Sequence, residues 1–285
     1  MIKDLKIALV LAGGTSHGVH QAGFLKALLE HVPLEYFKVV SASSIGCFNG
    51  YGVFTGKLEK VEELWKSIDG GSIFNLYQMA NKQGFINRFI DEICSENDNL
   101  APAFYATTVY LSKGTINYWK MQGEFNKDWK IRLAQAVSFP FLVKRTNHNG
   151  EKHVDGGLFD NTPVYPLQYE NDVDLTLILH VDPKYRPDFS LFKKSKIVLD
   201  IMVDANDFSA TSHFNFKKEF LNKGFESGYN YGIDICSRLF SNSTDIETML
   251  KNSQQIYCEE LKKRNRAAMP TIVTKINNLF LNQNE

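Results

Sequence analysis

Two strand–turn–helix units at the start of the chain decide the fold. In the first, the apolar run KIALVLA (6–12) leads into the glycine-rich turn GGTSHG (13–18), and helix-periodic residues follow from Val19 to Glu30. In the second, FKVVSA (37–42) leads into the turn SSIGC (43–47) and another helical pattern. Short buried strands that alternate with helices are typical of an α/β fold around a mainly parallel sheet.

Further strands are expected downstream of these two units. Residues 107–111 and 116–119 have the pattern of a hairpin, and LTLILHV (175–181) is a strongly apolar run. From about Ser190 the pattern turns helical, with apolar stripes expected at 191–205, 246–264 and 271–281.

The chain shows no internal repeat and no linker-like tract that would divide it. We therefore predict a single domain over residues 1–285, with 190–285 as a helical extension or cap. The predicted architecture has three layers, α/β/α, around a mainly parallel central sheet.

Composition excludes several classes of protein. The 285 residues include 32 Lys and Arg against 32 Asp and Glu, so the formal net charge is zero. Nucleic-acid binding normally requires a basic excess, and none is present. The 44% hydrophobic and 22% charged residues are ordinary globular values, which excludes a disordered chain. Cys and His residues lack zinc-ligand spacing, and no metal or cofactor is predicted.

The N-terminal apolar run is too short for a targeting signal. It spans Ile7 to Ala12, whereas a signal-peptide core needs roughly 7–15 residues, and no run reaches the roughly 20 residues of a membrane span. We expect a cytoplasmic protein. Peripheral membrane contact and export without a cleavable signal stay open.

The second turn has the steric pattern of a nucleophile elbow. Such an elbow places a Ser on a sharp strand-to-helix turn, where only small residues fit two positions before and two positions after it. Ser44 satisfies this rule on both sides, with Ala42 before it and Gly46 after it. The other interpretation of Ser44 is an ordinary helix N-cap.

The first turn favours anion or oxyanion binding. Backbone N–H groups of residues 13–18 are presented at the start of a helix, where developing negative charge is stabilised. Val19 stands where a phosphate-binding loop would have Lys, and the spacing of a dinucleotide loop is absent. Nucleotide binding is therefore disfavoured.

A third element is HVDGG (153–157), which follows a hairpin-like Asn149-Gly150 pair. An Asp at a strand end before two glycines can hold its carboxylate in a tight cavity, although Asp-Gly is also a common turn.

Taken in order, these three elements resemble the patatin-like phospholipase family over about the first two thirds of the chain. The segments AQAVSFPF (134–141) and LFDNTPV (158–164) also resemble the family's sequence on either side of its Asp motif. Two features depart from the family pattern. Ala42 stands where the family usually has Gly, and Thr15 and His17 replace a third Gly and a basic residue.

The resemblance implies a Ser–Asp dyad that hydrolyses lipid acyl esters without a His. Ser44 would be the nucleophile and Asp155 the general base. Backbone N–H groups of Gly13, Gly14 and Thr15 would form the oxyanion hole. Support would come from the small residues Ala42, Gly46, Gly156 and Gly157. The implied partner is a phospholipid, acylglycerol or other acyl ester.

Two other hypotheses remain open at this stage. One is a general carboxylesterase or thioesterase with a Ser–Asp–His triad, whose His would be His180 or His213. The other is a non-catalytic lipid- or acyl-binding protein whose loop has degraded at Thr15 and His17. Oligomeric state stays open.

Apolar segments near the predicted site are candidates for transient membrane contact. Core packing is the more frequent fate of such clusters, and a solvated face is the usual fate of a lysine run. The candidate segments are Phe139, Phe141 and Leu142, then Ile73, Phe74, Leu76 and Tyr77, and the basic run at 193–196.

Overall fold

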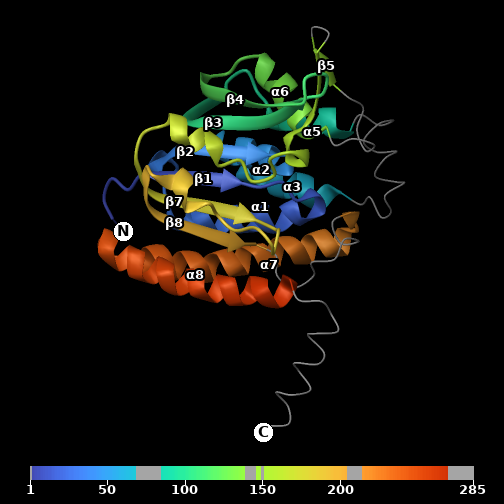
Figure 1. Cartoon of the computed structure of the whole chain (residues 1–285). Coiled ribbons are helices and arrows are strands. Elements are labelled where there is room, and N and C mark those ends of the chain that lie inside the picture. The colour runs from blue at the N-terminus through green and yellow to red at the C-terminus, as the bar shows by residue number, and fades with distance from the viewer. Residues whose placement is uncertain (1, 69–84, 139–145, 149–150, 204–213, 269–285) are drawn as a thin grey trace.

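The computed structural model describes residues 2–68, 85–138, 146–148, 151–203 and 214–268. At its centre lies an eight-stranded sheet with the order β5-β6-β3-β2-β1-β7-β8, and β4 pairs with β3 off this path (Figure 1). The strands are β1 (Ile7–Leu11), β2 (Phe37–Ser43), β3 (Asn99–Tyr110), β4 (Thr115–Glu124), β5 (Thr146–His148), β6 (Glu151–Asp155), β7 (Val173–His180) and β8 (Ser195–Met202).

Five neighbouring strands of this path run parallel, in the order β3, β2, β1, β7 and β8. The remaining strands are antiparallel additions: β4 and β6 pair with β3, and β5 pairs with β6. The predicted α/β fold with a mainly parallel sheet is confirmed. The expected hairpin is confirmed as β3 and β4, with Tyr110 opposite Thr115 at the turn.

β1 shows why a continuous apolar run forms a central strand. Its residues alternate between the two faces of the sheet, so Ile7, Leu9 and Leu11 enter the larger core while Ala8 and Val10 enter the smaller one. All five are fully buried. A strand covered on both faces needs apolar residues at every position.

Long helices cover the face that carries the larger core, and α8 packs against the edge strand β8 (Figure 1). Their apolar side chains pack on the sheet and exclude water from it. The helices are α1 (Gly18–His31), α2 (Ile45–Phe54), α3 (Leu58–Ser67), α5 (Phe85–Ile93), α6 (Asp128–Ala136), α7 (Lys218–Cys236) and α8 (Ile246–Ala268).

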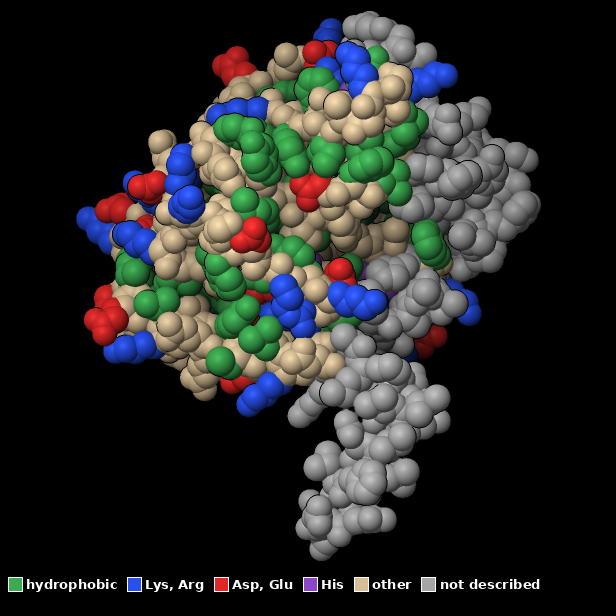
Figure 2. Space-filling model, viewed as in Figure 1, with side chains coloured by type: hydrophobic (Ala, Val, Ile, Leu, Met, Phe, Trp, Pro, Cys, Tyr) green, Lys and Arg blue, Asp and Glu red, His purple; other side chains and the backbone are tan. Residues whose placement is uncertain are grey.

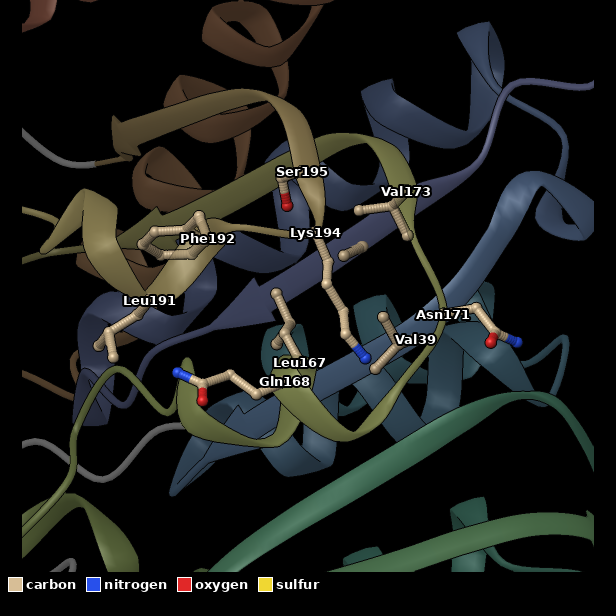
Figure 3. Close-up of a pocket in the computed structure, with 10 residues that line it drawn as sticks. Val39, Leu167, Gln168, Asn171, Val173, Leu191, Phe192, Lys194 and Ser195 are labelled. Atoms are coloured by element: carbon tan, nitrogen blue, oxygen red, sulfur yellow. The ribbon is translucent and has the colours of Figure 1, made fainter.

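The opposite face carries a thinner layer. Two short 3-10 helices, η4 (Tyr165–Tyr169) and η5 (Phe189–Phe192), contribute the side chains that pack on it. Figure 3 shows Leu167 and Phe192 from these turns, lying around the small cavity that Val39 of β2 also lines.

The predicted helix at 191–205 is wrong. Most of this range is the strand β8, parallel to β7. Ile197, Leu199 and Ile201 enter the larger core and Val198 packs on the smaller one, which is the two-residue period of a strand. Among the described residues after β8, the first long helix is α7, which begins at Lys218.

The amphipathic stretch at 246–264 is confirmed as part of α8. The expected helix at 271–281 lies outside the described residues, as do the candidate lipid-contact segments at 73–77 and 139–142. No helix among the described residues combines the length and apolar character needed to cross a bilayer.

Candidate active site

One edge of β3 brings the predicted Ser and Asp together. β2 pairs with this edge as far as Ser43, which lies opposite Thr107. β6 continues along the same edge, with Asp155 opposite Thr108, because β4 occupies the other edge. Thr107 and Thr108 are adjacent, so the residue that follows Ser43 meets Asp155.

The two side chains are in direct contact. The Ser44 hydroxyl donates a hydrogen bond of 2.5 Å to Oδ2 of Asp155. The backbone N–H of Gly157 donates to Oδ1 of the same carboxylate at 2.8 Å. Ser44 is 9% exposed and Asp155 is 1% exposed. The hydroxyl thus contacts the carboxylate directly, without an intervening imidazole.

The Ser44 backbone has the strained conformation of an elbow. Its φ of 53° and ψ of −133° are rare for a residue with a side chain, and Ser44 stands immediately before α2. A sparsely populated conformation of this kind costs about 1–3 kcal/mol and is typical of functional sites.

The small residues on either side of Ser44 lie in closely packed surroundings. A Cβ atom on Gly46 would lie 2.5 Å from the carbonyl oxygen of Leu11, too close for any side chain. Ala42 is fully buried in β2, where its neighbours are Leu11 on β1 and Ala106 on β3. The steric rule used on the sequence therefore has a direct cause in the packing of α2 on β1.

Burial raises the pKa of Asp155 to about 7, although the hydrogen bonds from Ser44 and Gly157 favour its ionised form. No cation pairs with Asp155 among the described residues. Desolvation without a counter-ion favours the protonated acid. Near neutral pH such a carboxyl group exchanges its proton readily, as a general base must.

The glycine-rich loop lies against the elbow. A Cβ atom on Gly13 would lie 2.7 Å from Cβ of Ser44 and 2.4 Å from Oδ1 of Asn161, so only Gly fits there. Gly13 and Asn161 also exchange two hydrogen bonds of 3.1 Å, one in each direction. The N–H of Gly13 is thus already donated to a carbonyl, contrary to its predicted place in an oxyanion hole. Gly14 and Thr15 remain candidates, and Thr15 has a left-handed φ of 49°.

Asn161 is the site residue that the sequence did not single out. It lies within the 158–164 segment that resembles the family, which is the one signal that could have drawn attention to it. Its side-chain amide donates to the carbonyl of Gly13, 148 residues earlier in the chain. This contact ties the loop after β1 to the loop after β6.

The two positions after Asp155 require glycine for different structural reasons. A Cβ atom on Gly156 would lie 2.6 Å from the backbone of Thr107. One on Gly157 would lie 2.8 Å from Oδ1 of Asn161 and 3.1 Å from Oδ1 of Asp155. The first glycine lets the loop approach β3, and the second leaves room for the carboxylate.

His17 and His180 are packed in the protein interior. His17 is buried, with its ring 5.9 Å from His20 and 5.8 Å from Phe220 near the start of α7. His180 is buried on β7, where its Nε2 lies 3.5 Å from Asp200. His213 lies outside the described residues.

His153 hydrogen-bonds through Nδ1 with the Thr108 hydroxyl at 3.2 Å. No group of three or more His, Cys, Asp or Glu side chains in the described ranges has an arrangement that could hold a metal ion.

Comparison with known proteins gives relatives of one kind at low identity. The chain is 24% identical over 192 residues to "Lysophospholipase NTE1" of Cryptococcus neoformans var. neoformans serotype D, covering 61% of this chain and 11% of that protein. It is 23% identical over 183 residues to the protein of the same name from Meyerozyma guilliermondii, covering 59% and 12%. The matched region is therefore only about a tenth of the length of these relatives.

Solved structures with a related shape are more distant. VipD from Legionella pneumophila aligns with a TM-score of 0.43 and 11% identity, covering 82% of this chain and 67% of that one. The type III effector protein ExoU aligns with a TM-score of 0.42 and 13% identity, covering 81% and 52%.

The family match covers the part of the chain that builds the site. The family model described as "Patatin-like phospholipase" matches residues 9–167, from β1 through η4, which is more than half of the chain. Gly13, Ser44, Asp155 and Asn161 all fall within this range. This chain belongs to the patatin-like phospholipase family.

Proposed function

We propose that this protein is a serine lipid acyl hydrolase of the phospholipase A or lysophospholipase type, which cleaves carboxylic esters of phospholipids or acylglycerols. The observation that carries the proposal is the 2.5 Å hydrogen bond from the Ser44 hydroxyl to the Asp155 carboxylate at a strained elbow. Family membership and relatives named as lysophospholipases support the substrate class.

Acylation of Ser44 would be the first half of the reaction. Oγ of Ser44 attacks the ester carbonyl carbon while its proton moves to Oδ2 of Asp155. The bond from carbon to the leaving oxygen then breaks, and the departing alcohol takes the proton from Asp155. Water then attacks the acyl carbon and gives a proton to Asp155. The bond from that carbon to Oγ of Ser44 breaks, the fatty acid leaves, and Asp155 returns the proton to Oγ.

Backbone N–H groups of Gly14 and Thr15 are the proposed donors to the tetrahedral oxyanion. Gly13 has a positioning role in this proposal, because its hydrogen bonds with Asn161 fix the loop beside Ser44. Loss of one oxyanion donor typically lowers turnover about 10²–10³-fold. Gly46, Gly156 and Gly157 contribute by leaving room for the backbone and the carboxylate, and Ala42 is the small buried residue two positions before the nucleophile.

Covalent labelling with a fluorophosphonate tests the nucleophile directly. We expect the wild-type protein to be labelled on Ser44, and Ser44→Ala to lose both labelling and hydrolysis of a short-chain ester. The matched control is Ser43→Ala, because Ser43 is the adjacent buried serine, and it should keep labelling.

Labelling that survives in Ser44→Ala would contradict the assignment. A wild-type protein that binds lysophosphatidylcholine but neither reacts nor hydrolyses would support the non-catalytic hypothesis instead. Loss of turnover in His180→Gln, without loss of folding, would favour the triad.

A further inference from the structure

Exposed apolar side chains gather in the segment that follows Asp155. Among the described residues, seven large hydrophobic side chains are exposed, and four of them lie between 158 and 169. These four, here called the docking face, are Leu158 (43% exposed), Phe159 (61%), Tyr165 (45%) and Tyr169 (62%). Contiguous exposed apolar surface on a monomeric protein often marks an interaction site.

The first part of the docking face is fixed to the candidate active site. Leu158 and Phe159 stand between Gly157, whose N–H donates to Asp155, and Asn161, whose amide donates to Gly13. One end of this short span is thus held by the Asp155 carboxylate and the other by the glycine-rich loop beside Ser44. The two apolar side chains nevertheless point to solvent, so their position beside the site is fixed and their exposure is not a product of a loose loop.

The second part is an aromatic cluster on the same segment. The Tyr165 and Tyr169 rings lie 5.4 Å apart, and the Tyr118 ring lies 6.1 Å from Tyr165. The Tyr118 hydroxyl donates to Asp160 at 2.6 Å, which joins the cluster to the residue after Phe159. Figure 2 shows hydrophobic side chains gathered across the upper part of this face, where Figure 1 places β3 and β4.

The acidic groups on this surface have partners within the chain. Asp160 accepts from Tyr118, and Glu170 accepts from Lys120 at 2.7 Å and from the Tyr105 hydroxyl. The surface therefore presents little unpaired charge. An uncharged aromatic surface suits the interface of a zwitterionic bilayer, where Tyr and Phe place apolar rings among acyl chains and hydroxyls among headgroups.

We propose that the docking face inserts into the surface of a zwitterionic phospholipid bilayer and delivers the ester bond to Ser44 and Asp155. The inference rests on the proposed function, because it assigns the source from which the lipid ester is taken. It commits to membrane lipid rather than to a protein partner or a dispersed monomeric ester.

Sedimentation with phosphatidylcholine vesicles tests the docking face without any catalysis. In a Ser44→Ala background, we expect Phe159→Ser combined with Tyr169→Ser to weaken vesicle binding about tenfold or more, since two exposed aromatic side chains are lost. The matched control combines Phe189→Ser with Leu250→Ser, which are also exposed but line a separate groove between β8 and α8. The control should bind within about twofold of the parent, because it leaves the docking face intact.

A conservative variant keeps the test valid if the serine variants fold poorly. Phe159→Trp preserves the bulk and should show a blue shift and quenching by brominated lipid when vesicles are added, whereas Phe189→Trp should not. Equal binding by the docking-face and control variants, or binding that requires phosphatidylserine, would overturn the proposal. So would the absence of vesicle binding.

Failure of the proposed function gives a different result. If the protein binds vesicles through the docking face but hydrolyses no ester, the docking proposal holds and the proposed hydrolase function is wrong. If the protein hydrolyses a soluble ester but does not bind vesicles, the hydrolase function holds and the docking proposal is wrong.

Discussion

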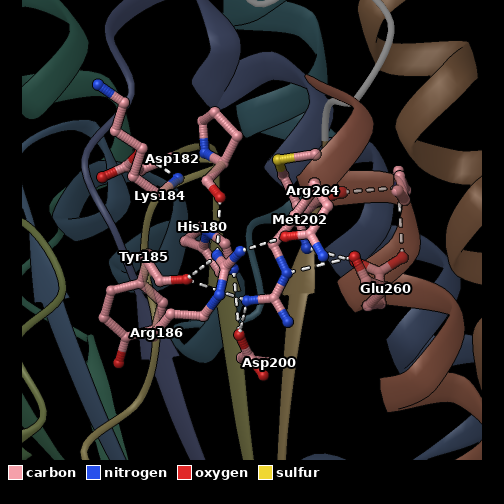
Figure 4. Close-up of polar contacts among 12 residues, drawn as sticks. His180, Asp182, Lys184, Tyr185, Arg186, Asp200, Met202, Glu260 and Arg264 are labelled. Atoms are coloured by element: carbon pink, nitrogen blue, oxygen red, sulfur yellow. Dashed lines mark hydrogen bonds and ion pairs between the residues drawn. The ribbon is translucent and has the colours of Figure 1, made fainter. Parts of the chain in front are cut away.

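Asp155 and Asp200 are both buried carboxylates close to the ends of strands, but they have different partners. Asp155 accepts hydrogen bonds from a hydroxyl and a backbone N–H, and burial raises its pKa to about 7. Asp200 accepts from the guanidinium of Arg264, which is also fully buried, and Nε2 of His180 lies 3.5 Å away (Figure 4).

The surroundings of Asp200 join α8 to the sheet. Glu260 of α8 accepts from the N–H of Met202 at 2.8 Å (Figure 4). Lys263 donates to the carbonyl of Met202 at 2.9 Å. Arg264 adds a bond to the carbonyl of Tyr185. Asp200 is therefore a buried acid paired with a cation, whereas Asp155 is a buried acid without one among the described residues, which makes Asp155 the candidate for proton transfer.

The largest expected difference between the two acids is in turnover. Asp155→Asn should lower the hydrolysis rate about 10³–10⁴-fold, because the amide cannot accept the Ser44 proton. Asp200→Asn should keep the rate per folded molecule within about tenfold, because Asp200 has no contact with the dyad. Steady-state kinetics on a short-chain ester, with the folded fraction measured by circular dichroism, gives both values. Similar losses of rate in the two variants would contradict the proposal that Asp155 takes part in the reaction and Asp200 does not.

The next largest effect is expected in stability, at the Asp200 site. Arg264→Met leaves Asp200 buried without its cation and should lower the free energy of unfolding by about 3–5 kcal/mol. The double variant Asp200→Leu/Arg264→Met should recover most of that loss, because no charge is then left unpaired. Denaturant unfolding measures both changes. Additive losses would show that the ion pair is not what makes Arg264 important.

The sequence predicts the local part of each site and misses the long-range part. Ser44 could be selected because Ala42 and Gly46 satisfy a steric rule that acts over five residues. Asp155 could not be assigned from its own turn, because its contact with Ser44 depends on the register of β2 and β6 along β3. Its assignment came from the order of motifs that resemble the family.

The β8 strand was missed for a related reason. A charged residue inside SKIVLDIM weakens the pattern of a buried strand, and the partner that makes Asp200 tolerable is Arg264, 64 residues later. The same limit hid the contact between Gly13 and Asn161, across 148 residues. Periodicity reports which faces are apolar, and it carries no information on which distant side chain neutralises a buried charge.

Stability should depend on pH through Asp155. Its pKa rises from 3.8 to about 7 on folding, so the folded state binds more protons than the unfolded state between these values. Stability is therefore greatest below about pH 4 as far as this group is concerned, and it falls as the pH rises toward 7. Relative to Asp155→Asn, the wild type should lose about 1.4 kcal/mol per pH unit, on the order of 4 kcal/mol in total.

Unfolding by denaturant at a series of pH values measures this difference. The Asn variant is a suitable reference, since its amide can accept from Gly157 and donate to Ser44. A difference between the two proteins that does not change from pH 4 to pH 8 would contradict the raised pKa.

The hydrolysis rate should also depend on the ionisation of Asp155, but it should rise with pH where stability falls. The proposed base acts when Asp155 is ionised, so kcat/KM should rise about tenfold per pH unit below 7 and level off above it. The profile is measured on a soluble ester, which keeps lipid binding out of the observed value. A rate that is constant from pH 5 to pH 8 would exclude Asp155 as the titrating base.

The smallest expected effect is on stability and comes from the strained backbone of Ser44, the residue that donates to Asp155. Ser44→Gly and Ser44→Ala both remove the hydroxyl that donates to Asp155, so comparing them shows the effect of a Cβ atom at a φ of 53°. Gly adopts this conformation without steric conflict, and Ser44→Gly should be about 1 kcal/mol more stable than Ser44→Ala. At Ser43, which lies in the regular strand β2, the order should reverse, with Ala more stable than Gly by about 0.5–1 kcal/mol. Thermal unfolding of the four variants measures both differences. The same order at both positions would mean that the strain at Ser44 contributes nothing to stability, and the reversed order would locate the strain at the proposed nucleophile.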